Sequence, residues 1–118
     1  MSMKSVSAIL TVVVLLSLTL ACRAGKVDPS VVREKIKAGA LVVDVRTLAE
    51  VAAGAYQGAI NIPLDQVETR LADFGDRKHP VVLFCRSGHR AGLAKAVLEK
   101  NGFADVTNGG GLKDMPPR

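Results

Sequence analysis

The sequence predicts one α/β domain, with a mostly parallel central sheet and helices on both of its faces. Short apolar runs alternate with stretches that carry helical spacing and helix caps, which is the pattern of strand-helix repeats. The run at 41–45 is apolar on both faces until Asp44, and the run at 81–84 is apolar throughout, as in strands that are covered on two sides. The length of 118 residues allows one ordinary domain.

Composition excludes several other classes of protein. With 48% hydrophobic and 23% charged residues the chain is globular rather than disordered. Its two cysteines form no Cys-x-x-Cys pair or Cys/His cluster, so we expect no metal. Aromatic residues for stacking on bases are scarce, at one Tyr, three Phe and no Trp. The net charge of +5 is spread along the chain, so no nucleic-acid partner is expected.

The N-terminus has the pattern of an export signal. No charged residue occurs between Ser5 and Cys22, while Lys4 precedes this apolar stretch and Arg23 follows it. We therefore interpret residues 1–24 as a signal peptide and expect the protein in the periplasm or cell envelope of a bacterium. A retained single-pass anchor is the alternative, although the apolar run is shorter than the roughly 20 residues that a span needs.

Two cleavage points fit this signal. Ala21-Cys22 resembles the end of a bacterial lipoprotein box, which predicts cleavage before Cys22 and a lipid on that cysteine. Ordinary cleavage after Ala24 is the alternative and removes Cys22. Membrane contact is therefore expected only through the signal or a lipid anchor, and the folded domain spans residues 27–118.

The first half of that domain contains two strands and two helix starts. Asp28-Pro29 is a helix N-cap followed by a favourable first residue, and Gly39 ends this helix. Its apolar face is predicted to hold Val31, Val32 and Ile36. A strand over 41–45 follows, and the capping box Thr47-Leu48-Ala49-Glu50 starts the next helix. A second short strand is predicted over 59–62.

The second half repeats the pattern. Asp65 and Glu68 predict a helix that closes near Gly75 and presents Leu64, Val67 and Leu71 inward. The run 81–84 is a central strand, and a helix over about 90–100 follows it. That helix is predicted to face the core with Leu93, Ala94, Val97 and Leu98. Residues 105–107 form a last short strand before three flexible glycines at 109–111.

Ligands of such sheets bind beyond the carboxyl ends of the strands, where two polar segments are expected to meet. One is Asp44 to Arg46, and the other is the loop Cys85-Arg86-Ser87-Gly88-His89-Arg90. A loop that leads into a helix N-terminus points backbone N–H groups and the positive end of the helix dipole inward. Gly88 allows the tight curl, and the basic side chains of Arg86, His89 and Arg90 add positive potential. A thiol at its floor is expected to be a thiolate nucleophile.

A structural cysteine beside solvated arginines is the other interpretation of this loop, since buried cysteines are often inert. The joint occurrence of Cys85, Gly88, two arginines and a following helix at one spacing favours the functional interpretation. Asp44 and Arg46 are expected in a supporting position that orders the loop by hydrogen bonds, or else as a strand-end carboxylate and a surface base.

Cys85-x-x-Gly88-x-Arg90 resembles the active-site loop of the rhodanese family, the thiosulfate sulfurtransferases. Further stretches extend the resemblance over most of the chain, and it is closest to the single-domain exported phage-shock type of bacteria. These stretches are Asp44-Val45-Arg46, Gly58 to Pro63, and Gly110-Gly111-Leu112-Lys113-Asp114. Family members often have His where this chain has Ala55, and an aromatic residue where it has Leu112.

The resemblance implies a two-step sulfur transfer through a persulfide on Cys85, from thiosulfate or another sulfane-sulfur donor. The acceptor is cyanide or a thiol, the latter including a thioredoxin-like protein. Residues Arg86 through Arg90 form the cradle and Arg86 and Arg90 help to bind the donor, with no metal or organic cofactor. The C-x4-R spacing favours sulfur over the C-x5-R loops of related phosphatases and arsenate reductases. A carrier without small-molecule turnover is a further alternative, and we expect a monomer.

Overall fold

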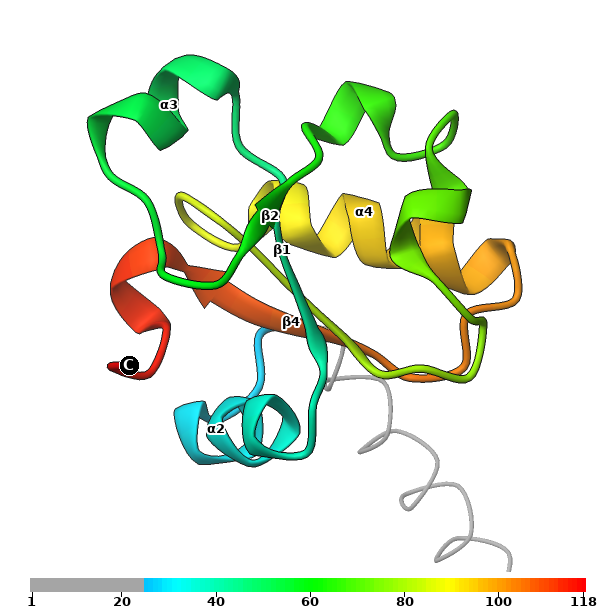
Figure 1. The fold of residues 1–118 in the computed structure, drawn as a ribbon, viewed down its shortest axis with the longest axis horizontal. Helices are drawn as coiled ribbons and strands as arrows, with labels where there is room; N and C mark the ends of the chain where they lie inside the picture. The colour runs from blue at the N-terminus through cyan, green and yellow to red at the C-terminus, as the bar shows by residue number, and fades with distance from the viewer. Residues whose placement is uncertain (1–24) are drawn as a thin grey trace, which may run out of the picture.

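The computed structural model describes residues 25–118 (Figure 1). The predicted signal peptide, the anchor alternative and Cys22 lie outside the described residues. Between residues 25 and 118, no helix has the length and apolar character needed to cross a bilayer. In chain order the elements are α2 (Pro29–Lys37), β1 (Leu41–Asp44), α3 (Leu48–Ala53), β2 (Ile60–Asn61), the 3₁₀ turns η1 (Leu64–Gln66) and η2 (Leu71–Phe74), β3 (Val81–Cys85), α4 (His89–Lys100), β4 (Val106–Gly111) and the 3₁₀ turn η3 (Leu112–Asp114).

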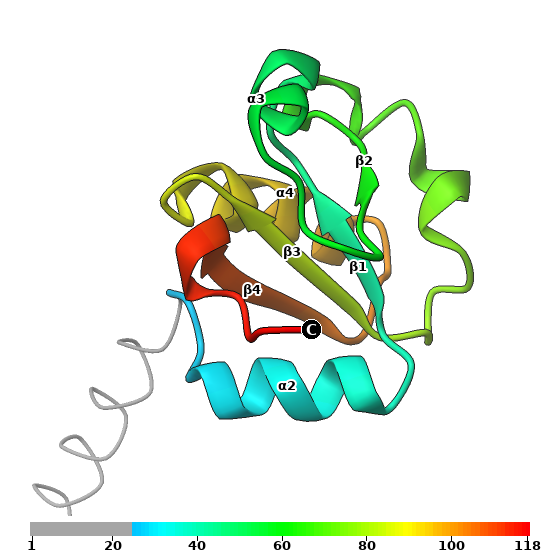
Figure 2. The same cartoon turned by 60° about the vertical axis from the view of Figure 1, so that its left-hand side comes forward.

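A four-stranded sheet in the order β2-β1-β3-β4 forms the centre of the domain (Figure 2). Each neighbouring pair is parallel, and Asp44 of β1 lies beside Phe84 of β3 while Cys85 lies beside Gly111 of β4. This confirms the predicted α/β class. Because all strands run the same way, the loops after β1, β3 and β4 meet at one edge of the sheet.

Helices cover both faces of this sheet, as the sequence predicts. On one face, buried residues of α4 and of the stretch that contains η1 and η2 pack against alternate strand residues, including Val43, Leu83 and Cys85. On the other face α2 packs against Val42, Val82 and Phe84 through residues such as Val32 (Figures 1 and 2). The alternation within β3 turns the Cys85 side chain toward the face that α4 covers.

The helix predicted from Asp65 to Gly75 is wrong. Two separate 3₁₀ turns, η1 and η2, occupy this stretch, and they still bury Val67 and Phe74 completely. Arg70 between them has φ −120° and ψ 33°, outside the helical region, and the Thr69 hydroxyl donates to the Gln66 carbonyl at 3.1 Å. Side-chain burial therefore prevails over a helical pattern that is too short to sustain itself.

The predicted helix starts at Asp28 and Thr47 are confirmed, but two of the predicted core positions are wrong. The Asp28 side chain caps α2, and Thr47 and Glu50 form the reciprocal capping box of α3. Val31 is 42% exposed and Leu93 is 47% exposed, whereas Val32, Ala94 and Leu98 are fully buried. The sheet contacts a narrower stripe of each helix than the apolar pattern covers, so the flanking residues reach solvent.

The glycines at 109–111 are not a flexible segment after β4 but part of that strand, and all three are buried. Glycine is needed here for close approach. A Cβ on Gly109 would lie 2.9 Å from the Met115 sulfur, and one on Gly111 would collide with the Arg86 carbonyl oxygen. β4 can therefore press directly against the loop that follows β3.

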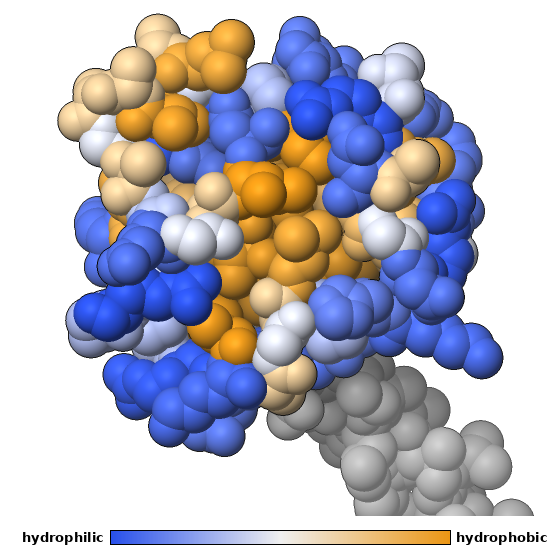
Figure 3. All heavy atoms as spheres, in the orientation of Figure 1, coloured by the Kyte–Doolittle hydropathy of each residue, from blue (hydrophilic) through white to orange (hydrophobic). Residues whose placement is uncertain are grey.

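At the other side of the sheet the edge strand β2 contains only two residues. Figure 3 shows apolar atoms across the middle of the face seen in Figure 1, surrounded by polar ones. Ile60 of β2 is 39% exposed. A strand this short offers few unpaired backbone groups to another chain.

Candidate active site

The loop between β3 and α4 surrounds the Cys85 sulfur. Cys85 is fully buried, and the Gly88 N–H donates to Sγ at 3.0 Å. Gly88 is the N-cap of α4 with φ 96°, a left-handed conformation that glycine adopts without strain. The predicted curl of this loop is confirmed, and it places the sulfur at the N-terminus of a twelve-residue helix.

Asn108 of β4 fixes the same loop from the neighbouring strand. Its Nδ2 donates to the Gly88 carbonyl at 3.0 Å, and its Oδ1 accepts from the Gly110 N–H at 2.9 Å. Sequence reasoning missed this buried residue. The only signal was a polar side chain inside a strand that ends beside Cys85, and its meaning depends on the strand order.

The carboxylate of Asp114 fixes the end of β4. It accepts from the Gly111 N–H at 2.8 Å and lies 3.3 Å from the Lys26 ammonium. Chiefly the first of these bonds, and then Lys26, hold the pKa of Asp114 below its ordinary value. Because Gly111 touches the backbone of Arg86, this turn also supports the loop.

Arg90 forms a two-pronged ion pair with Glu50 of α3. Its two terminal nitrogens donate to the two carboxylate oxygens at 2.7 and 2.8 Å. The Glu50 hydrogen bond is the main reason that the pKa of Arg90 is raised, and the charge on Cys85 contributes in the same direction. Arg90, helped by the Thr47 N–H, lowers the pKa of Glu50 to about 2. Glu50 is thus both the capping residue that the sequence predicts and the holder of an arginine of the loop.

Asp44, the last residue of β1, forms a buried pair with Arg46; the two residues are 2% and 5% exposed. Arg46 donates to the Asp44 carboxylate through Nε, at 3.0 Å to each oxygen, and through Nη2 at 2.7 Å. The hydrogen bond from Asp44 is the main reason that the pKa of Arg46 is raised. Arg46 also donates to the Gly54 carbonyl at 2.7 Å and more weakly to the Glu50 carbonyl at 3.4 Å. Arg46 thereby fixes the middle and the C-terminal end of α3, the helix that carries Glu50.

The remaining loop side chains, Arg86, Ser87 and His89, are exposed. Two surface depressions flank them. One of about 410 Å³ is lined by Arg46, Arg86, Leu112 and Lys113. The other, of about 500 Å³, lies beside the start of α4 and is lined by Gly25, Lys26, Ser87, Gly88, His89, Gly92, Leu93 and Asn108.

Lys113 lines the first of these depressions, and its only signal in the sequence is its place in the stretch Gly110 to Asp114. Within residues 25–118, no group of three or more His, Cys, Asp or Glu side chains is arranged to hold a metal ion. The basic side chains of Arg46, Arg86 and Lys113 line one of these depressions, which gives it positive potential. A buried sulfur under a helix N-terminus, with cations at the rim, is suited to nucleophilic attack on an anionic compound and to holding a charged sulfur adduct.

The chain belongs to the rhodanese family. Residues 28–114 match the family described as the Rhodanese-like domain, which is most of the chain. Thiosulfate sulfurtransferase PspE of Escherichia coli is 40% identical over 74 residues, covering 62% of this chain and 71% of that protein. A sulfurtransferase of Allochromatium vinosum is 37% identical over 68 residues, with 58% of this chain and 63% of that protein covered.

Solved structures support the same assignment. A rhodanese with anions from E. coli superposes with a TM-score of 0.62 at 38% identity, covering 68% of this chain and 95% of that one. The human single-domain sulfurtransferase TSTD1 gives a TM-score of 0.64 at 28% identity, with 71% and 87% covered. The chain is therefore similar to sulfurtransferases in sequence and in fold, and a donor and an acceptor of sulfur are implied in general.

Proposed function

We propose that this protein transfers sulfane sulfur from thiosulfate to cyanide or a thiol through a persulfide on Cys85. The observation that carries the proposal is the 3.0 Å hydrogen bond from the Gly88 N–H to a buried Cys85 sulfur at the start of α4. Similarity to two sulfurtransferases supports the type of reaction. The spacing Cys85-x4-Arg90 supports sulfur rather than the larger oxyanions of phosphatases and arsenate reductases.

In the first step the Cys85 thiolate attacks the outer sulfur of thiosulfate. The new bond joins Sγ to that sulfur, the S–S bond of thiosulfate breaks, and sulfite leaves with the bonding electron pair. In the second step cyanide or a thiolate attacks the outer sulfur of the persulfide. Thiocyanate or an acceptor persulfide forms, and the electron pair of the broken bond returns to Cys85 as thiolate, so no external oxidant or reductant is consumed.

The loop supplies the electrostatics for both steps. The Gly88 N–H and the other amides of residues 86–90 stabilise negative charge on the bound sulfur. Arg86 is exposed at the rim and is suited to contact the donor, together with Ser87 and His89. Arg90 acts on the sulfur through its charge while Glu50 holds it in place. Asp44 and Arg46 act one step away, through α3.

The same proposal covers location and assembly. Residues 1–24 direct export to the bacterial periplasm, and cleavage precedes Cys22, which is then lipidated, or follows Ala24. The domain over 27–118 acts as a monomer. Its acceptor in the cell is a thiol, with a thioredoxin-like protein as one candidate.

Thiosulfate and cyanide test the reaction. The full chain should form thiocyanate, and Cys85→Ser should abolish it. Intact mass after thiosulfate alone should rise by one sulfur, which cyanide then removes. The matched control is Cys22→Ala, which should keep both the mass gain and the turnover because the proposed reaction gives Cys22 no role.

Each other outcome rejects the proposal. Turnover that survives in Cys85→Ser removes Cys85 as nucleophile. A stable mass gain without transfer to cyanide or small thiols indicates a persulfide carrier. Arsenate or phosphate-ester turnover that exceeds thiosulfate turnover assigns the loop to oxyanion chemistry.

A further inference from the structure

The depression lined by Arg46, Arg86, Leu112 and Lys113 is built over the carboxyl ends of three neighbouring strands. Arg86 directly follows Cys85, the last residue of β3. Lys113 stands two residues after Gly111, whose backbone is paired with Cys85. Figures 1 and 2 both show the loop after β3 between α3 and the turn η3 that carries Lys113. Strand order therefore brings Lys113, from a distant part of the chain, to the same depression as Arg86, the residue that follows Cys85.

The basic side chains around the loop differ in whether a carboxylate of the protein already forms an ion pair with them. Arg46 is bound to Asp44, and Arg90 is bound to Glu50. Within residues 25–118, Arg86 and Lys113 have no carboxylate within ion-pair distance, and both are exposed. Asp114, which adjoins Lys113, directs its carboxylate at Gly111 and Lys26 instead.

We infer that this depression binds the anionic end of the sulfur donor, and that Lys113 is a donor-binding residue together with Arg86. The inference rests on the proposed function. Thiosulfate carries two negative charges, and the two unpaired cations match them. The depression has a volume of about 410 Å³, which also leaves room for donors that carry an organic group on the sulfonyl sulfur. Arg90, held by Glu50, keeps its charge near the sulfur and leaves contact with the donor to the other two.

The rate at which Cys85 is alkylated by a charged reagent measures the positive charge of Lys113 and Arg86 without any sulfur transfer. The full chain with Cys22→Ala is treated with iodoacetate, an anion, and with neutral iodoacetamide, and the ratio of the two rate constants is compared among variants. Lys113→Gln should lower this ratio about 3- to 10-fold, as expected for one unit charge lost a few ångströms from the approaching anion. Lys113→Arg should restore most of it.

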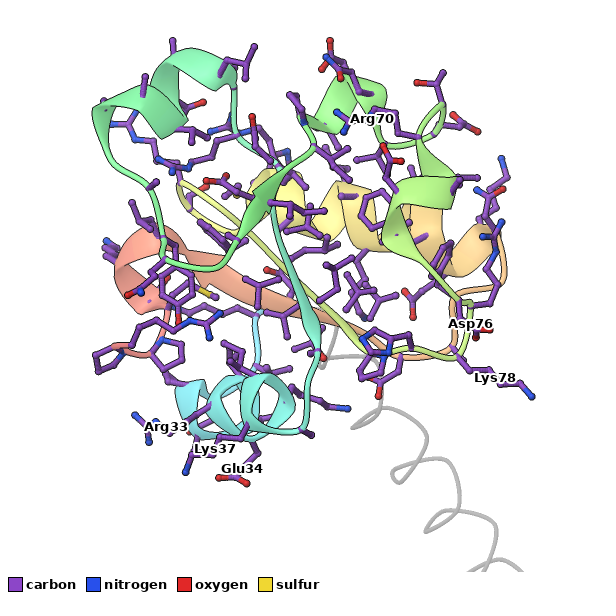
Figure 4. All side chains as sticks on the ribbon, in the orientation of Figure 1. Arg33, Glu34, Lys37, Arg70, Asp76 and Lys78 are labelled. Carbon is purple, nitrogen blue, oxygen red and sulfur yellow. The ribbon has the colours of Figure 1, made fainter. Side chains whose placement is uncertain are left out.

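Lys78→Gln is the matched control, because Lys78 is an exposed lysine far from the loop (Figure 4). It should leave the ratio unchanged. In turnover, Lys113→Gln should raise KM for thiosulfate more than KM for the monoanion methanethiosulfonate, with kcat retained. A mere structural role of Lys113 would alter both donors and both alkylating agents alike.

The outcomes separate the inference from the function on which it rests. An unchanged alkylation ratio in Lys113→Gln, or an equal change in Lys78→Gln, overturns the subsite whatever the turnover. A different result is that the alkylation ratio falls in Lys113→Gln while thiosulfate never adds sulfur to the wild-type protein. That result overturns the proposed function and leaves an anion-binding depression.

Discussion

Asp44→Asn should be among the most destabilising conservative changes in the domain. The Asp44 and Arg46 side chains are 3% and 6% exposed, and the carboxylate receives Nε and Nη2 of Arg46 at 2.7 to 3.0 Å. An asparagine keeps the shape and one acceptor oxygen. It removes the charge and turns an NH₂ group toward the guanidinium, so Arg46 stays buried with the Gly54 carbonyl as its main partner.

The size of the effect follows from the burial. Removing one partner of a buried ion pair costs about 3–5 kcal/mol, and we expect about 3 kcal/mol because one acceptor oxygen remains. A domain of roughly 90 residues has a free energy of unfolding of about 5–13 kcal/mol. At about 4–8 °C per kcal/mol, Tm should fall by about 12–24 °C.

Urea and thermal unfolding provide the assay, with Asp65→Asn as the control. Asp65 is exposed on η1 and should change the free energy of unfolding by less than about 0.5 kcal/mol. The double variant Asp44→Leu with Arg46→Met should recover much of the loss, because no unpaired charge remains buried. A cost of less than about 1 kcal/mol for Asp44→Asn would refute the reasoning, since it would mean that water already reaches the pair.

Two further predictions concern the same edge of the sheet. Gly111→Ala should displace the loop and abolish most turnover, since the new Cβ collides with the Arg86 carbonyl oxygen. Gly54→Ala is the control, because Gly54 has φ 171° and no heavy atom lies within 4 Å of an added Cβ. Equal turnover in both variants would contradict the packing argument. Glu50→Gln should unfold more easily than the wild type at neutral pH and equally easily near pH 2. The folded-state pKa of Glu50 is lowered from 4.5 to about 2, so its stabilisation is complete above pH 4.5 and disappears as pH falls toward 2. Melting curves from pH 2 to pH 7 measure this, and a difference in Tm that stays constant over the range would count against the ion pair with Arg90.

Much of the candidate site can be predicted from short segments of the sequence. Cys85, Gly88 and Arg90 lie within six residues, and the curl that joins them depends on a glycine and on the helix that follows. The caps at Asp28 and Thr47 are equally local, since each side chain bonds a backbone group two or three residues away. Such local features can be predicted from the sequence because they depend on few residues outside the segment.

The failed predictions involve contacts between distant residues. The stretch 65–75 has an apolar spacing that fits a helix, and its turns are instead set by burial of Val67 and Phe74. The glycines at 109–111 suggest flexibility in a linear reading, but each has a buried place beside the loop or Met115. Leu93 looks like a core residue until the width of the helix contact is known.

The residues that hold the loop between β3 and α4 also depend on contacts between distant parts of the chain. The alternation of strands and helices and the Cys-x4-Arg loop are properties of short windows, so the residue order was enough to predict an α/β domain with a reactive cysteine at a strand end. Glu50 lies 40 residues from Arg90, and Asn108 lies 20 from Gly88. Parallel strand order brings them together, along with Lys113. Their roles depend on which strand ends lie side by side, because hydrogen bonds and charges act over a few ångströms of space and not along the chain.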